Sequence, residues 1–149
     1  MEIIYMTNVE NLKKIYAIDS NLEDSYILPI ILKCQDLIIQ PLFCEKDYDK
    51  IIEEIANDAV TPQTATILSY IEPIIAQYVL AESIFSTAFK SKNNPDYQEN
   101  AKSLYTEINY LNGKYMADVK QYTNKLYKYL CKIGIAHKES GAKFGICTW

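Results

Sequence analysis

Arginine is absent from this chain, and all fifteen of its basic residues are lysine. Arginine forms the bidentate hydrogen bonds that bind phosphate and recognise guanine, so its absence disfavours sequence-specific nucleic-acid binding. The four glycines form no GxGxxG or GxxxxGK[ST] motif that would hold the phosphates of a nucleotide. The chemistry that remains must come from lysine, carboxylate and aromatic side chains.

Histidine is nearly absent. His137, the single one, stands in a glycine-rich C-terminal segment, where a catalytic triad would lack a rigid scaffold. The chain has neither Glu-x-x-His pairs nor a His/Cys cluster of the kind that binds iron or zinc. Glu53 and Glu54 are adjacent, and on a helix they would point about 100° apart. We therefore predict a protein that is not an enzyme and needs no cofactor or metal.

Long apolar runs and export signals are also missing. The longest apolar run, Ile27 to Leu32, is interrupted by Pro29 and is far shorter than the roughly 20 residues of a membrane span. Glu2 stands where a signal peptide would carry positive charge. The four cysteines show no CxxC spacing, which favours reduced thiols in the cytoplasm; they are Cys34, Cys44, Cys131 and Cys147.

What the chain does contain indicates an all-α protein. From Asp96 to Ile133 there is no proline and a single glycine, and apolar residues recur every three or four positions. This pattern predicts one long amphipathic helix, or two nearly continuous ones, lying against other helices. At 149 residues, with 49% hydrophobic and 23% charged residues, the chain fits one soluble domain. We expect a bundle of about four main helices.

Two helices are predicted in the first 40 residues. Thr7 or Asn8 can cap a short helix that ends near Ile15. The next helix is expected over residues 22–39, kinked by Pro29. Its predicted inward face consists of Leu22, Tyr26, Ile27, Ile30, Ile31, Cys34, Leu37 and Ile38.

Two further helices are predicted before the long one. An acidic helix is expected over residues 47–57, within a segment, 45–58, that carries six acids and two lysines. Thr61 and Pro62 form a cap and first-turn proline that open a broadly apolar helix toward Phe89. We expect Pro73 to interrupt this helix, and residues 91–96 to form a polar loop.

Charge is divided unevenly along the chain. Residues 1–109 contain 17 Asp or Glu against 8 Lys, a net charge of −9, whereas residues 110–149 contain 7 Lys against 2 acids, a net charge of +5. Such a chain can set acidic against basic faces when copies pack around a ring. Two separately solvated helix faces would give the same pattern.

The C-terminal segment, residues 134–149, is predicted to be a flexible docking tail that follows a helical domain over residues 1–133. It holds three of the four glycines and ends in Phe144, Ile146 and Trp149. These are too few apolar residues for a core of their own. The tail therefore docks on another chain, with Trp149 as its anchor, or folds back on its own bundle.

Several stretches resemble the head-to-tail connector, or adaptor, proteins of tailed bacteriophages, and most closely those of short-tailed, crAss-like phages. The similarity covers roughly residues 7–133. The segments that carry it are Thr7-Asn8-Val9-Glu10-Asn11-Leu12, Ile18-Asp19, the helix end from Cys34 to Leu42, Tyr70-Ile71-Glu72-Pro73 through Tyr78, Ala81-Glu82-Ser83, Phe89-Lys90, and Tyr110-Leu111 through Tyr115 to Leu126-Tyr127-Lys128-Tyr129-Leu130.

The resemblance implies a structural virion protein at the head–tail junction, made in the host cytoplasm. Its members form a ring, usually of twelve subunits, beneath the portal protein and above the next tail ring protein, and DNA passes through without sequence-specific contacts. An acidic channel face would let DNA slide. The candidates for that face are Glu45, Asp47, Asp49, Glu53 and Glu54. The alternative is a cytoplasmic helical-bundle module that binds a partner protein through its tail.

Overall fold

The structure, a computed structural model, describes residues 2–90 and 101–138. These residues form helices joined by short turns, with one isolated antiparallel bridge and no strand, so the all-α prediction is confirmed. A π-helix, η1, and a 3-10 turn, η2, connect the second α-helix to the third. The elements are α1 Val9–Ile15, α2 Asp24–Cys34, η1 Gln35–Ile39, η2 Gln40–Leu42, α3 Glu45–Ala56, α4 Pro62–Lys90 and α5 Ala101–Ile133.

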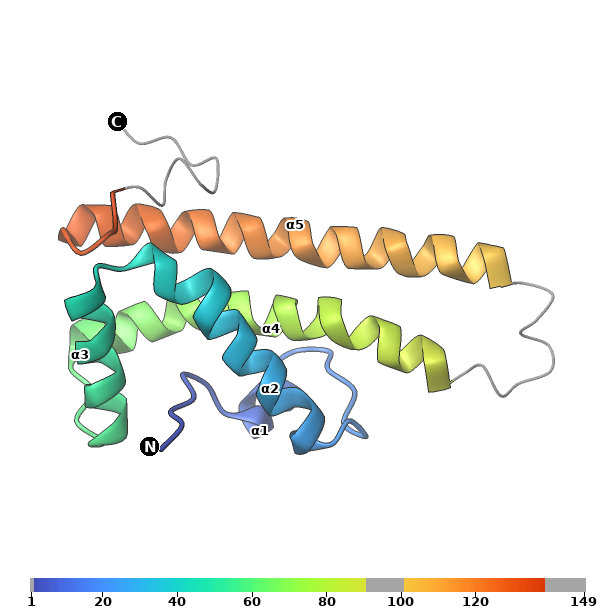
Figure 1. Ribbon diagram of the computed structural model, residues 1–149, viewed down its shortest axis with the longest axis horizontal. Helices are drawn as coiled ribbons and strands as arrows, with labels where there is room; N and C mark the ends of the chain where they lie inside the picture. Colours follow the sequence, from blue (N-terminus) through green and yellow to red (C-terminus); the bar gives the residue numbers. More distant parts are fainter. Residues whose placement is uncertain (1, 91–100, 139–149) are drawn as a thin grey trace.

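A long antiparallel pair, α4 and α5, forms the body of the protein (Figure 1). Helix α2 packs on α4, α1 lies beneath, and α3 lies at the end of the bundle where α5 finishes. The rings of Tyr70 and Tyr129 stack with their centroids 4.9 Å apart, and Asn112 donates a hydrogen bond of 2.8 Å to the carbonyl of Ala81. The side chains at the centre of this pair are fully buried; they are Ile71, Ile74, Ile75, Val79, Leu126 and Leu130.

Pro73 lies inside α4 without ending it, so the predicted interruption is wrong. Proline removes one backbone hydrogen bond from the helix and crowds the preceding turn. The apolar residues on both sides of it, Ile71 and Ile74, are fully buried and hold the helix in place. Packing of an apolar face outweighs local helix propensity here, as it does in most protein helices.

The same helix is apolar enough over Pro62–Ile84 to cross a membrane by length and composition, although it contains no long uninterrupted apolar run. Its apolar residues are separated by small polar ones, so no single run is long. Half of this stretch is buried inside the protein. A core helix that packs against both α2 and α5 has the same composition.

Helix α2 is shorter than predicted, because the chain widens into the π-helix η1 after Cys34. A π-helix closes its hydrogen bonds over five residues instead of four, so it turns the following side chains away from the α-helical face. Leu37, predicted to point inward, is 58% exposed, whereas Gln35 and Ile39 are 1% and 0% exposed. The predicted inward face is therefore wrong at Leu37 and also at Tyr26, which is 37% exposed, whereas Ile38 is partly buried against the core. The other predicted residues are buried; they are Leu22, Ile27, Ile30, Ile31 and Cys34.

Gln35, brought inward by this change, holds the extended N-terminal segment. Its Oε1 accepts a hydrogen bond of 2.7 Å from the amide of Met6, and its Nε2 donates one of 3.1 Å to the carbonyl of Ile4. Tyr48 of α3 lies beside it: burial raises the pKa of Tyr48 to about 12, and a hydrogen bond with Gln35 acts in the opposite direction. One side chain thus links the N-terminal segment, η1 and α3.

Residues 134–138, which the sequence prediction placed in the tail, pack against the bundle. Gly134 has φ of +80°, which lets the chain reverse at the end of α5. The amide of His137 then donates a hydrogen bond of 2.8 Å to the carbonyl of Leu42. The Tyr127 hydroxyl donates one of 3.0 Å to the carbonyl of His137. These contacts tie the end of α5 to the connection between η2 and α3.

Candidate interaction surfaces

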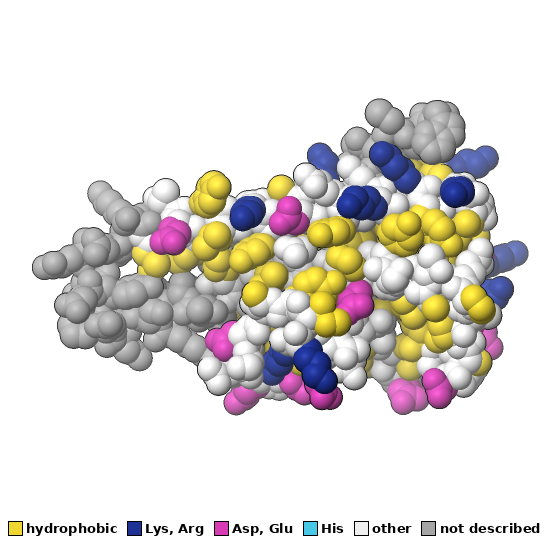
Figure 2. Space-filling view, turned by 180° about the vertical axis from the view of Figure 1, so that it is seen from behind, with side chains coloured by type: hydrophobic (Ala, Val, Ile, Leu, Met, Phe, Trp, Pro, Cys, Tyr) yellow, Lys and Arg dark blue, Asp and Glu magenta, His cyan; other side chains and the backbone are white. Residues whose placement is uncertain are grey.

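Opposite edges of the bundle carry opposite charge. Lysine side chains are in excess along the edge formed by α5, and acidic side chains are in excess along the edge formed by α1, α3 and the start of α2, although each edge also carries some charges of the other sign (Figure 2). The uneven charge along the sequence thus becomes a separation of charge in space. The two edges, and an open groove between the N-terminal segment and α4, are the surfaces on which a ligand or partner could act.

A lysine ridge runs along the outer face of α5, which we define by Lys114, Lys125, Lys128 and Lys132. Their spacing of eleven, three and four residues returns each to the same side of a helix. All four are exposed, and none forms an ion pair with a carboxylate in the described part of the chain. Lys120 belongs to a different face, about a third of a turn away.

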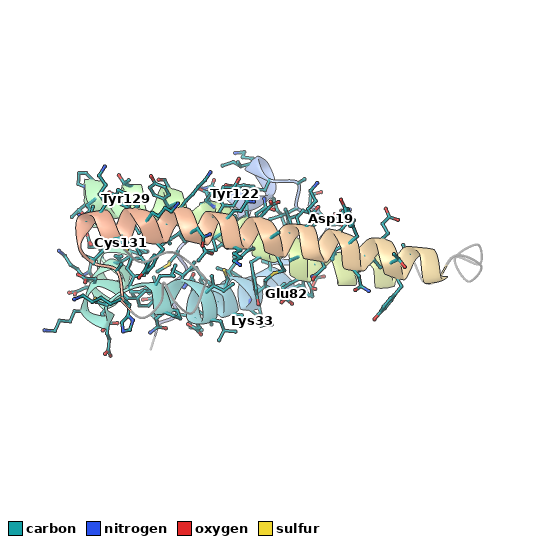
Figure 3. The ribbon with its side chains drawn as sticks, turned by 90° about the horizontal axis from the view of Figure 1, so that it is seen from above. Asp19, Lys33, Glu82, Tyr122, Tyr129 and Cys131 are labelled. Atoms are coloured by element: carbon teal, nitrogen blue, oxygen red, sulfur yellow. The ribbon has the colours of Figure 1, made fainter. Side chains whose placement is uncertain are left out.

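Tyrosines accompany the ridge. The side chain of Tyr110, 70% exposed, lies one turn before Lys114 and on the same face. Tyr122 lies beside the ridge, visible from above in Figure 3, and the Nζ of Lys125 is 5.4 Å from the centroid of its ring. Tyrosine is enriched at protein contact surfaces, where charged groups such as these lysines belong to the polar rim rather than the centre.

The five acidic candidates all lie on α3, but on two sides of it. Glu45, Asp49 and Glu53 are four residues apart, are exposed and form one row, which we call the acidic row. Asp47 and Glu54 are half-buried and lie on the other side of the helix. The structure thus brings three of the five carboxylates together on one solvent-facing surface.

Glu54 has a structural partner that the sequence interpretation missed. Its Oε1 accepts a hydrogen bond of 3.0 Å from the amide of Thr61, and its Oε2 accepts one of 2.7 Å from the hydroxyl of Thr64. The hydroxyl of Thr61 also accepts a hydrogen bond from the amide of Thr64, which caps α4 as predicted. The hydrogen bonds from Thr64 and then Thr61 lower the pKa of the Glu54 carboxyl below its usual 4.5.

We expect Glu54→Gln to destabilise the protein near neutral pH and to remove one component of its acid sensitivity. A carboxylate whose pKa is lowered by folding stabilises the fold above its unfolded pKa of about 4.5, and this contribution disappears as the pH falls through the folded value. Urea unfolding of both proteins between pH 7 and pH 3 measures the difference. The difference in free energy of unfolding between the unmodified chain and Glu54→Gln should become smaller as the pH falls. Glu53→Gln is the matched control, and an equal effect of that variant would contradict this assignment.

An acidic corner is formed by α1, the turn that follows it and the start of α2; we define it by Glu10, Asp19, Glu23 and Asp24. The ammonium of Lys13 holds the corner together, because it donates to the carbonyls of Leu22 and Ser20 and lies 3.7 Å from Asp24. The carboxylate side chain of Asp24 remains 68% exposed. Ile15 is exposed at the end of α1 in the same region.

The groove has a volume of about 510 Å³ and is open to solvent. One carboxylate, Glu72, lies among its lining residues, and the hydroxyl of Ser69 donates to the carbonyl of Thr66 rather than to a base. Its lining therefore does not place a nucleophile against a general base. The groove is lined by Tyr5, Met6, Thr7, Asn8, Asn11, Val60, Ala65, Leu68, Ser69 and Glu72.

Phe144, Ile146 and Trp149, the predicted anchors of the tail, lie outside the described residues. Within residues 2–90 and 101–138, no three His, Cys, Asp or Glu side chains come together in a way that could hold a metal ion.

Residues 39–136, about two thirds of the chain, match a single protein family. The chain belongs to the family of unknown function DUF6712. No curated protein and no solved structure matches it.

The DUF6712 span contains α3, α4 and α5, and its two ends lie side by side. Phe43 and Ala136 form the antiparallel bridge between the chain entering α3 and the chain leaving α5. The amide of Cys44 also donates a hydrogen bond of 3.2 Å to the carbonyl of Ile135. The acidic row and the lysine ridge both lie within this DUF6712 unit, whereas the acidic corner precedes it.

Proposed function

We propose that this protein is a structural virion subunit that forms a ring between the capsid portal and the tail of a bacteriophage and extends the DNA channel. The separation of charge in space carries the proposal: the acidic row lies on α3, at the end of the bundle where α5 finishes, and the lysine ridge lies on the outer face of α5 (Figure 1). The resemblance of residues 7–133 to phage connectors supports it. A ring subunit needs one surface toward DNA and others toward its neighbours.

The proposed mechanism is passive. A surface that carries Glu45, Asp49 and Glu53 repels DNA phosphates, so the duplex slides along it, whereas lysines would hold the backbone in a salt-dependent way. We therefore orient the exposed row of α3 toward the channel and the lysines of α5 away from the DNA, toward a neighbouring subunit. Asp47 and Glu54 add negative charge behind the row. Their half-buried positions make them supporting charges rather than contacts.

The partners follow from this arrangement. The ring, with about twelve copies by the resemblance, contacts the portal protein above and the next tail ring protein below. Phe144, Ile146 and Trp149 provide the apolar anchors for one of these contacts, as the sequence indicates. The assembled protein is located at the head–tail junction.

Native mass spectrometry of the purified protein, alone and mixed with the portal protein of the same genome, tests the proposal. We expect a complex that carries about one copy of this chain per portal subunit. A protein that stays monomeric and ignores the portal would overturn the proposal and favour a binding module that uses its tail. Truncation at Lys138 serves as a second measurement, because loss of portal binding without loss of the fold would assign the contact to the tail.

Reversing the acidic row is expected to slow DNA ejection. In Glu45→Lys/Asp49→Lys/Glu53→Lys, three exposed cations per subunit would face the phosphates around the whole ring, and their attraction grows with each contact. Ejection from assembled particles, followed by a DNA-binding dye, measures the rate, and raising the salt concentration should restore it. The control reverses Glu107, an exposed acid on α5. Ejection at the original rate would rule out a channel role for the row.

A further inference from the structure

We propose that copies of this chain join through unlike surfaces, with the lysine ridge of one copy seated on the acidic corner of the next. The occupant of the ridge is thus a second copy of the same chain. This inference rests on the proposed ring and adds which surfaces of neighbouring subunits meet. Complementary charge on opposite edges of one molecule carries it.

The ridge provides a large part of a protein contact. From Tyr110 to Lys132 the outer face of α5 extends for about 33 Å at 1.5 Å per residue. A helix face of that length and of the 10–12 Å helix diameter covers roughly 400 Å², about half of the ~800 Å² that each partner buries in a standard interface, so flanking side chains must complete the contact. Its four lysines have no carboxylate partner in the described part of the chain, and Tyr110 provides an exposed aromatic group beside them.

The corner offers the complementary chemistry. Glu10, Glu23 and Asp24 are exposed, and Lys13 has its ammonium bound to the carbonyls of Leu22 and Ser20. Lys14, one turn after Glu10 on α1, is also exposed and leaves the corner with an excess of negative charge. Ile15, 66% exposed, supplies an apolar group in the same region, as Tyr110 does on the ridge. An apolar centre with charged groups around it is the usual composition of a specific interface.

The positions of the two surfaces decide the symmetry. The ridge and the corner lie on opposite edges of the bundle in both views along its short axis (Figures 1 and 2). A contact between unlike, opposite surfaces repeats from copy to copy and produces a ring when the rotation closes. Contacts of ridge with ridge, or corner with corner, would place like charges together and are disfavoured. The arrangement therefore disfavours a two-fold dimer, and the proposed function selects the ring over an open filament.

A charge-exchange experiment tests the contact. Lys125→Glu/Lys128→Glu leaves the ridge with two lysines and two glutamates, and Glu10→Lys/Glu23→Lys leaves the corner with two lysines and two aspartates, so each variant removes the net charge of one surface and reverses two of its four contacts. We expect each variant alone to weaken subunit association at least about tenfold, measured by sedimentation and native mass spectrometry, alone and on the portal protein. Mixing the two variants should restore assembly, with the two copies alternating around the ring.

The control is Lys46→Glu/Lys120→Glu, which changes the net charge by the same amount away from the ridge and should assemble normally. Circular dichroism establishes that each variant is folded. Rings that persist in both ridge and corner variants would overturn the inference while leaving the proposed ring intact, as would a mixture that fails to assemble from folded copies. Absence of any assembly by the unmodified chain, even with the portal, would instead overturn the proposed function and with it this contact.

Discussion

Replacement of Ile39 by alanine is expected to lower the free energy of unfolding by about 2–5 kcal/mol, the range for truncating a fully buried aliphatic side chain. Ile39 ends the π-helix η1 and is 0% exposed. The removed methylene groups leave a cavity between η1 and its neighbours. Leu37→Ala, two residues earlier, removes a side chain that is 58% exposed and should change stability by less than about 0.5 kcal/mol.

Urea denaturation of the two variants, followed by circular dichroism, measures this contrast. The pair is informative because a continuous α-helix over residues 22–39 predicts the opposite order, with Leu37 inward. A larger loss for Leu37→Ala than for Ile39→Ala would show that the segment is α-helical in solution. Equal m-values for the two variants and the unmodified chain would establish that the comparison concerns one native fold.

The π-helix explains why the sequence predicted most of this fold and failed at this point. Helix α5 could be predicted because its apolar residues keep one α-helical period from residue 101 to Ile133, and α4 could be placed at its start by Thr61 and Pro62. No sequence signal marked the change of period after Cys34. It arises because Gln35 reaches backbone groups of the N-terminal segment, a tertiary contact between residues about 30 positions apart.

Pro73 illustrates the same principle in the opposite direction. Its ring is a strong local signal for a break, yet α4 continues through it because the neighbouring side chains are buried on two sides, against α2 and α5. Local propensity is a weak predictor where an apolar face packs along its whole length.

The candidate surfaces were only partly accessible from the sequence. The excess of lysine in the last 40 residues predicted a basic region, but only the helix geometry shows that four of these lysines share one face. Among the acids of α3, the sequence could not separate Glu54 from the exposed row, because its partners, Thr61 and Thr64, come from the next helix. A carboxylate that caps a neighbouring helix has the same sequence pattern as a solvated one.

Replacement of Gln35 by leucine should release the N-terminal segment and lower the free energy of unfolding by about 1–3 kcal/mol. Leucine has a similar volume but makes no hydrogen bonds, so the amide of Met6 and the carbonyl of Ile4 lose their partners in a region where Gln35 is 1% exposed. A buried donor or acceptor left without a partner costs its full desolvation penalty.

Two measurements separate this effect from a general loss of packing. The rate of hydrogen exchange at the Met6 amide should rise by at least the factor that corresponds to the loss of global stability. The reason is that the N-terminal segment can open without the rest of the bundle. Gln40→Leu, at an exposed glutamine five residues later, is the matched control and should leave both stability and exchange unchanged. If Met6 stayed protected in Gln35→Leu, the segment would be held by Met6 itself, whose side chain is buried in the core. The hydrogen bonds of Gln35 would then serve to fix the π-helix rather than the N-terminal segment.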